Sequence, residues 1–162
     1  DTTNITDMKG IFWHRLDFND NISDWNTSNV INMDCMFERA TKFNQPIGNW
    51  NTSNVKSMNC MFHEATEFNQ SLEKWDTSNI IDMGNMFSCA TNFNQSIENW
   101  DISNVTDMTH MFCFALNFNQ DLNKWNIDNV KDITNIFKGA QNFDRLNYSK
   151  WGINYHDGMF LI

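Results

Sequence analysis

The sequence has little proline, little glycine and few positive charges. One Pro and six Gly occur in 162 residues, which argues against a collagen and against a flexible linker. The 11 Lys and Arg are outnumbered by 20 Asp and Glu, for a net charge of −9. Phosphate repels such an acidic chain, so we expect no nucleic-acid partner. No apolar run approaches the roughly 18 residues of a membrane helix, so we expect no membrane insertion.

Aromatic residues are abundant and recur with a period of 25. Seven Trp and 14 Phe in so short a chain indicate a packed core rather than disorder. The tryptophans at equivalent positions are Trp25, Trp50, Trp75, Trp100 and Trp125. Two phenylalanine columns, which begin at Phe12 and Phe18, keep the same period. The chain is therefore an internal repeat, and its fold has to be interpreted as one.

The repeat predicts a single elongated domain over residues 1–162. One unit is too short to bury its apolar side alone, so the copies must stack and share one continuous core. We expect units at about 1–25, 26–50, 51–75, 76–100, 101–125 and 126–150. A C-terminal cap is expected over 151–162, where His156-Asp157-Gly158 signals a turn.

Within each unit the apolar spacing changes from that of a strand to that of a helix. The strand pattern of a leucine-rich repeat is followed by Ile47, Trp50, Thr52 and Val55. The next apolar residues fall at i, i+3, i+6, i+7 and i+10, which predicts one apolar stripe of a short helix. They are Val55, Met58, Met61, Phe62 and Ala65. The predicted fold class is an α/β solenoid of about six units, with one parallel sheet and short helices on the other side.

The motif that carries these columns is NxW(N/D)TSN(V/I)xxMxxMFxxAxxFNQ, and it runs from about Ile5 to Phe143. It resembles the 25-residue repeat of BspA-like leucine-rich-repeat surface proteins, in particular the variety abundant in mycoplasma lipoproteins. The resemblance implies a right-handed solenoid, secreted or displayed on a bacterial cell surface, with roles in adhesion, host contact or antigenicity. It transfers no catalytic residue. We expect a mature or trimmed form, because the sequence from Asp1 shows no signal peptide, lipidated Cys or wall anchor.

Two columns are expected to be structural ladders. The tryptophans are expected in the core, because burying each ring removes about 150–250 Å² from water; the alternative is an aromatic platform for a carbohydrate or peptide. A buried asparagine column is expected to hydrogen-bond the backbone of the adjacent turn. Its members are Asn29, Asn54, Asn79, Asn104 and Asn129. Trp13 and Phe114 lie outside the columns and are the better candidates for surface contacts.

No arrangement typical of catalysis, metal binding or a cofactor is recognised. GxSxG and SxxK are missing, and six near-equivalent acidic environments cannot separate two pKa values, so we expect no enzyme. The histidines share no column and form no HxxxH or HExxH pair, which favours solvated side chains. They are His14, His63, His110 and His156. Calcium is disfavoured because the GGxGxDxUx signature is absent.

The four cysteines are candidates for two disulfide bridges. Cys35 and Cys60 occupy the same position in neighbouring units, and Cys89 and Cys113 differ by one position. Stacking could bring each pair within the ~4.4–6.8 Å Cα separation of a disulfide, although coils that splay apart would leave free thiols. An even count in an extracellular chain favours bridging.

The expected function is recognition of a protein partner, a host cell-surface component among the candidates. Polar side chains beside the predicted strands differ between units, whereas the packing positions hardly change. This candidate interaction face consists of Asn26, Asn49, Asn51, Lys74, Asp76, Asn99, Asp101, Lys124 and Asn126. The part of it lined by Asn26, Asn51, Asp76, Asp101 and Asn126 is polar and largely acidic, and it would steer a basic partner. The alternative is a self-associating spacer, a homodimer joined through an N-terminal edge that the sequence does not cap.

Overall fold

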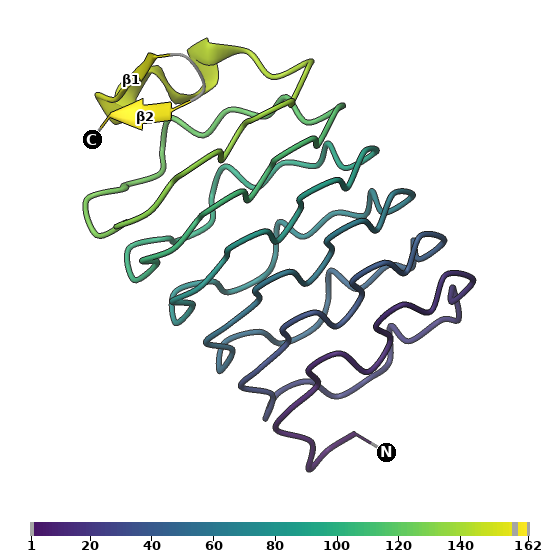
Figure 1. Ribbon diagram of the computed structural model, residues 1–162. Helices are drawn as coiled ribbons and strands as arrows, with labels where there is room; N and C mark the ends of the chain where they lie inside the picture. Colours follow the sequence, from purple (N-terminus) through teal and green to yellow (C-terminus); the bar gives the residue numbers. More distant parts are fainter. Residues whose placement is uncertain (1, 157–158, 162) are drawn as a thin grey trace.

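In the described part of the chain, the helix and the two strands all lie at the C-terminal end. The computed structural model describes residues 2–156 and 159–161. A 3₁₀ helix, η1 (Arg145–Trp151), is followed by strands β1 (Asn154–His156) and β2 (Met159–Leu161). The two strands pair antiparallel, with Tyr155 opposite Phe160 (Figure 1). Residue 1 of the first predicted unit lies outside the described residues. So do residues 157, 158 and 162 of the cap predicted over 151–162.

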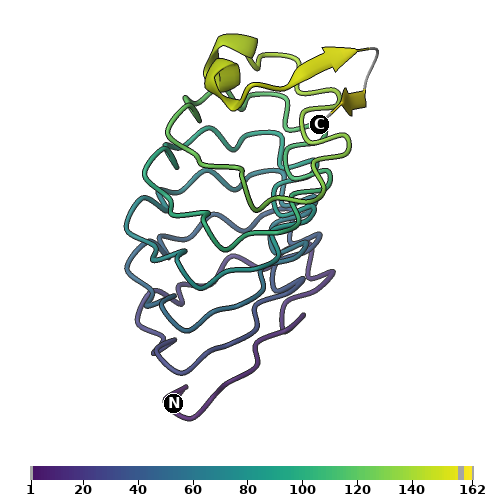
Figure 2. The ribbon, with the colours of Figure 1, turned by 90° about the vertical axis from the view of Figure 1, so that its left-hand side faces the viewer.

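The preceding chain winds in coils, one per 25-residue unit, that stack from the N-terminal end toward η1. Figures 1 and 2 show the coils lying one on another in two views at right angles. Neighbouring coils are joined by parallel bridges between residues 25 apart, which are Asp7–Asn32, Asn32–Ser57, Ser57–Asp82, Asp82–Asp107 and Asp107–Asp132. Each bridge is isolated. Each of these six residues therefore pairs with the neighbouring coils as an isolated bridge and not as part of a longer strand.

The predicted parallel sheet is wrong. The segment expected to be a strand is bent twice by hydrogen bonds between a residue and the one three positions later. The N–H of Trp50 donates to the carbonyl of Ile47 at 3.1 Å, and the N–H of Val55 donates to that of Thr52 at 2.9 Å. A chain that turns every few residues cannot extend a ladder, so the apolar residues face inward from turns and not from a pleated strand.

The predicted short helices are wrong too, and no α-helix is formed within residues 2–156 and 159–161. In the expected helical segment the N–H groups of Cys60, Phe62 and Glu64 donate to carbonyls of the next coil at 2.8–2.9 Å. Cys60 and Glu64 have φ values of 56° and 58°, in the left-handed region that no α-helix contains. Successive three-residue turns reproduce the apolar spacing of a helix, and this explains why the sequence pattern was misleading.

Aromatic rings stacked between coils form the centre of the protein. Within one coil the ring centroids of Phe62 and Phe68 are 4.1 Å apart, and Phe62 lies 5.5 Å from Phe87 in the next coil. Trp75 and Trp100 stack at 6.4 Å with an interplanar angle of 5°. In the central coils the phenylalanine rings are fully buried and the tryptophans are almost fully buried. The coil-to-coil contacts therefore supply the continuous core that one unit lacks.

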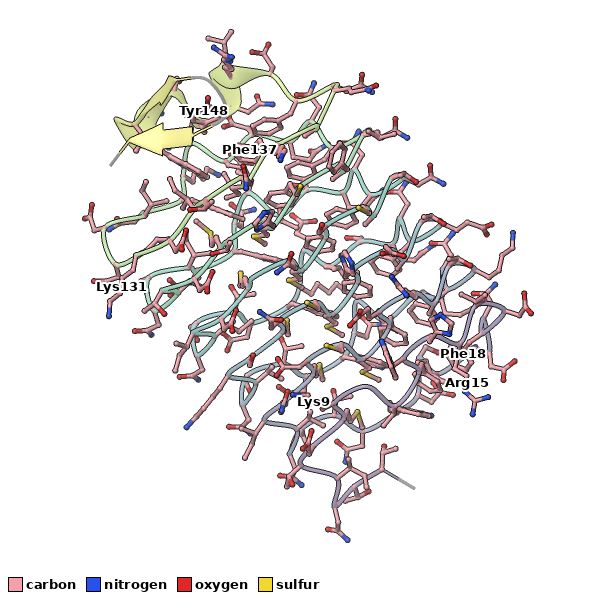
Figure 3. All side chains as sticks on the ribbon, in the orientation of Figure 1. Lys9, Arg15, Phe18, Lys131, Phe137 and Tyr148 are labelled. Carbon is pink, nitrogen blue, oxygen red and sulfur yellow. The ribbon has the colours of Figure 1, made fainter. Side chains whose placement is uncertain are left out.

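Helix η1 closes the C-terminal end of these columns. Asp144 caps it by accepting a hydrogen bond from the N–H of Leu146 at 2.9 Å, as expected of an N-cap carboxylate. Tyr148 stacks on Phe137 with ring centroids 5.4 Å apart, and the two lie together in Figure 3. Trp151 continues the tryptophan column, 6.2 Å from Trp125.

Candidate interaction surface

The nine residues of the interaction face are all exposed. They form two columns, one directly before and one directly after each tryptophan of the core. The Trp side chain points inward, so its two neighbours in the chain project outward. This alternation brings every predicted residue of the face to the surface. It also spaces equivalent side chains by one coil.

The column that follows each tryptophan is held in place by its own turn. The Oδ1 atom of Asn51 accepts the backbone N–H of Ser53 at 3.0 Å and its hydroxyl at 2.7 Å. Asp76 accepts the N–H of Ser78 in the same way at 3.0 Å. Such side-chain-to-backbone bonds are typical of Asn and Asp in turns. The oxygen used in the turn is fixed, and the rest of each group faces solvent.

The column that precedes each tryptophan is held by contacts between coils. The Nζ atom of Lys74 lies 3.2 Å from Oδ1 of Asn49. The Nζ atom of Lys124 lies 3.1 Å from Oδ1 of Asn99 and 3.1 Å from a carboxylate oxygen of Glu98. The same contact between a Lys and an Asn thus occurs twice, 50 residues apart in the sequence. Each exposed ammonium group has a defined position.

The charges on the face are mixed. Lys74 and Lys124 balance Asp76 and Asp101 in number, and Glu98 beside Lys124 adds a further negative charge. Hydrogen bonds from the hydroxyl and N–H of Ser103 lower the pKa of Asp101 below its ordinary value of 3.8. The carboxylate of Asp101 is therefore ionised at neutral pH.

The asparagine column lies at the surface, so its predicted burial is wrong. Asn79 is exposed, and its Nδ2 donates to the carbonyl of Ser53 in the preceding coil at 2.8 Å. The same bond is made by Asn29, Asn54, Asn104 and Asn129. The amide has to reach an outward-facing carbonyl of a turn that has no sheet partner. This places the ladder at the edge of each coil.

The tryptophan column is not a surface platform. Trp50, Trp75, Trp100 and Trp125 are each 4% exposed, and Trp25 is half-buried at the N-terminal end. The aromatic residues outside the columns are exposed instead: Trp13 by 58% and Phe114 by 48%. Isolated exposed rings of this kind are better suited to contact a partner than the buried column is.

The four cysteines are free thiols, so neither candidate bridge, Cys35–Cys60 or Cys89–Cys113, is formed. Three of the thiols are half-buried and that of Cys113 is buried. The Cys35 thiol is hydrogen-bonded to Glu38 and to Cys60. Burial, the bond to Glu38 and nearby negative charges raise the pKa of Cys35 to about 12. Burial, with the charge of Glu38 as a further cause, raises the pKa of Cys60 to about 11. Both thiols are therefore protonated at neutral pH.

These two thiols belong to a cluster of possible metal ligands that the sequence did not predict. Ligand atoms of Cys35, Glu38 and Cys60 all lie within 4.8 Å of one another. The histidine of the adjacent coil, His63, is not the solvated side chain that was expected: its Nδ1 is buried and, among the described residues, has no hydrogen-bond partner. The signal was present as Cys35-x-x-Glu38 and Cys60-x-x-His63, at equivalent positions of successive units.

The other histidines fit no common role. His14 is exposed, whereas His110 is half-buried with its Nε2 3.0 Å from Nδ2 of Asn135. The side chain of His156 lies outside the described residues. Among the residues described, no helix combines the length and the apolar character that crossing a bilayer requires.

The fold and its surface define a class of protein built from stacked 25-residue coils with ring columns inside and polar columns outside. The chain belongs to the family described as "Mycoplasma protein of unknown function, DUF285", whose model matches residues 1–78 and 70–160. Comparisons with curated proteins and with solved structures gave no significant match.

Proposed function

We propose that the protein is a secreted or surface-displayed repeat module that binds a protein partner through the interaction face. The observation that carries the proposal is the fixed position of its exposed groups. Asn51 and Asp76 are held by their own turns, and Lys74 is held by the coil before it. Binding to a preorganised polar surface costs little side-chain entropy, and this favours recognition.

The surface location rests on the family and on the repeat motif. The chain is a member of a Mycoplasma repeat family, and its motif resembles that of BspA-like leucine-rich-repeat surface proteins. A role in adhesion, host contact or antigenicity follows from that resemblance. An elongated stack presents many equivalent positions to a partner, which suits a protein that has to bind a large surface.

Electrostatic steering should contribute to this binding. The net charge of −9 attracts a basic partner and raises its association rate at low ionic strength. Because exposed charges are screened over about 8–10 Å at 0.1–0.15 M salt, added salt should weaken capture of the partner. Binding that is identical at low and high salt would contradict the electrostatic part of the proposal.

Capture from a host-cell membrane extract tests the proposal with two matched variants. The face variant combines Lys74→Asn, Lys124→Asn, Asp76→Asn and Asp101→Asn, each of which installs the residue found at the equivalent position of another coil. The control variant, Lys42→Asn with Glu67→Asn, removes one charge of each sign from an exposed ion pair elsewhere, so it leaves the net charge unchanged, as the face variant does by removing two of each sign. We expect the bound protein to be retained by the wild type and the control and lost by the face variant. Equal retention by both variants would contradict the proposal.

Self-association is a second candidate, favoured by the apolar surface of the first coil. Ile11 and Leu16 are 43% and 47% exposed and, with the half-buried rings of Phe12 and Phe18, line a surface hollow of about 590 Å³. Light scattering across a dilution series of this chain and of Leu16→Lys tests it. A dimer that the substitution dissociates is expected; a monomer at every concentration would rule it out.

A further inference from the structure

We propose a zinc site between the second and third coils. Cys35 and Glu38 supply ligands from the second coil. Cys60 and His63 supply ligands from the third coil. The metal would join two coils by their side chains, independently of the interaction face.

Three of the four ligands are already assembled. The sulfur atoms of Cys35 and Cys60 and a carboxylate oxygen of Glu38 lie within 4.8 Å of one another. A tetrahedral zinc ion with sulfur at about 2.3 Å separates its ligands by roughly 3.8 Å. A small contraction of these three side chains would therefore bring their ligand atoms to the spacing that a zinc ion requires. The backbone supports this, since the N–H of Cys35 donates to Asn59 of the next coil at 2.8 Å and fixes the coils side by side.

We assign His63 as the fourth ligand because of its position in the repeat and a ring nitrogen that is unpartnered among the described residues. It occupies the position in its coil that Glu38 occupies in the preceding one, and its carbonyl accepts the N–H of Arg39 at 2.8 Å. Its Nε2 lies 3.3 Å from a carboxylate oxygen of Glu64. A neutral imidazole that donates from Nε2 presents an unprotonated Nδ1, the form that binds metal. That Nδ1 atom is buried and lacks a hydrogen-bond partner in the described part of the chain.

The surroundings favour entry of a cation. A surface hollow of about 450 Å³, open to solvent, is lined by Lys9, Gly10, Trp13, Cys35 and Glu38, two of the proposed ligands among them. The carboxylates of Asp34 and Asp82 act on Cys60 through their negative charges. The ammonium group of Lys9 lies 3.8 Å from Asp34, so its charge is partly offset.

The ligand types select the metal. Two sulfurs with one imidazole and one carboxylate suit a borderline-soft ion such as Zn²⁺, whereas Ca²⁺ and Mg²⁺ require oxygen ligands. On binding, each thiol S–H bond breaks, a sulfur–zinc bond forms, and the two protons leave to solvent. No electron is transferred. Binding should therefore release about two protons per metal ion.

The test titrates the reduced, metal-free protein with Co²⁺ as a spectroscopic substitute and then with Zn²⁺. We expect one metal ion per chain, thiolate-to-cobalt absorption with the intense visible bands of a tetrahedral site, and displacement of Co²⁺ by Zn²⁺. A saturating Zn²⁺ concentration should raise the thermal midpoint by about 5 °C or more, as for any ligand at about 100 times its dissociation constant.

Substitutions assign the ligands. Cys60→Ser should weaken Zn²⁺ binding by at least about 100-fold, and Glu38→Gln or His63→Gln by about 10-fold or more. The matched control is Cys89→Ser, which removes a half-buried thiol that, among the residues the structure describes, belongs to no such cluster; it should leave binding unchanged. Circular dichroism confirms that each variant is folded. Binding by folded Cys60→Ser equal to that of the wild type, an equal loss in Cys89→Ser, or no thiolate-to-cobalt absorption from the folded wild type would overturn the proposal.

Discussion

The indole nitrogen of Trp75 donates a hydrogen bond to the carbonyl oxygen of Ile47, 28 residues earlier, at 3.1 Å. A side chain of one coil is thereby tied to the backbone of the coil before it. The same bond is formed, at 2.9–3.2 Å, by Trp50, Trp100, Trp125 and Trp151. Each tryptophan fills the core and fixes the spacing of two coils. This explains why each repeat has Trp at this position and not another large apolar residue, which would lack the indole N–H donor.

Replacement of Trp75 by Phe should destabilise the protein by about 1–3 kcal/mol, because one buried hydrogen bond is lost and the smaller ring leaves a void. Trp25→Phe is the matched control: Trp25 is half-buried and, in the described chain, its indole nitrogen has no such acceptor. Urea unfolding followed by circular dichroism measures both. Equal losses in the two variants would show that the hydrogen bond between coils contributes nothing.

Phe68→Ala should cost about 3–5 kcal/mol, since a fully buried ring is removed from a column that cannot collapse around the cavity. Phe143 occupies the equivalent position near the C-terminal end and is only half-buried, so Phe143→Ala should cost less. The free energies of unfolding in urea give the comparison. A larger loss for Phe143→Ala would be inconsistent with a core centred on the middle coils.

Left-handed backbone positions recur in the coils, and they predict an unusual preference for glycine. Cys89 has φ 58°, and Gly139 occupies the equivalent position with φ 71°. Cys89→Gly should therefore be more stable than Cys89→Val by about 1–2 kcal/mol, because a β-branched side chain clashes in the left-handed region. Thermal unfolding of the two variants measures the difference. If Val were tolerated as well as Gly, the turn geometry assigned to the coils would be wrong.

Acid should destabilise the protein partly through Asp101. Its folded-state pKa lies below the ordinary value of 3.8, so its contribution to stability is present above that value and is lost as the pH falls through the folded-state pKa. Asp101→Asn keeps an acceptor for Ser103 but does not titrate. The stability advantage of the wild type over Asp101→Asn should shrink between about pH 5 and pH 2, measured by urea unfolding at each pH. Parallel stability curves would exclude this linkage.

The period and the inward-facing residues could be predicted from the sequence, because residues that pack between coils hardly vary. Phe62 and Phe87, for example, are both fully buried at equivalent positions. The path of the backbone between these residues could not be predicted. Apolar residues three and four apart fit a helix and a series of three-residue turns equally well. The two are distinguished by the positive φ values at Cys60 and Glu64 and by the N–H groups that donate to the next coil.

The candidate site was predictable in part for a related reason. Exposure of residues such as Lys74 and Asp76 follows from their place on either side of a buried Trp. The cluster of Cys35, Glu38 and Cys60 depends on which side chains face each other across two coils. Each coil supplies only part of the set, so the cluster is recognised only when Cys35-x-x-Glu38 and Cys60-x-x-His63 are compared across two units.

Hydrogen exchange of the tryptophan indole N–H groups, followed by ¹⁵N–¹H NMR, tests the stack of coils most directly. Five indoles should exchange slowly, those of Trp50, Trp75, Trp100, Trp125 and Trp151, because each donates to a carbonyl of the preceding coil. The exposed Trp13 and the terminal Trp25 should exchange fast. Fast exchange of all seven indoles would contradict the stacked arrangement. So would protection of Trp13 and Trp25 equal to that of the five hydrogen-bonded indoles.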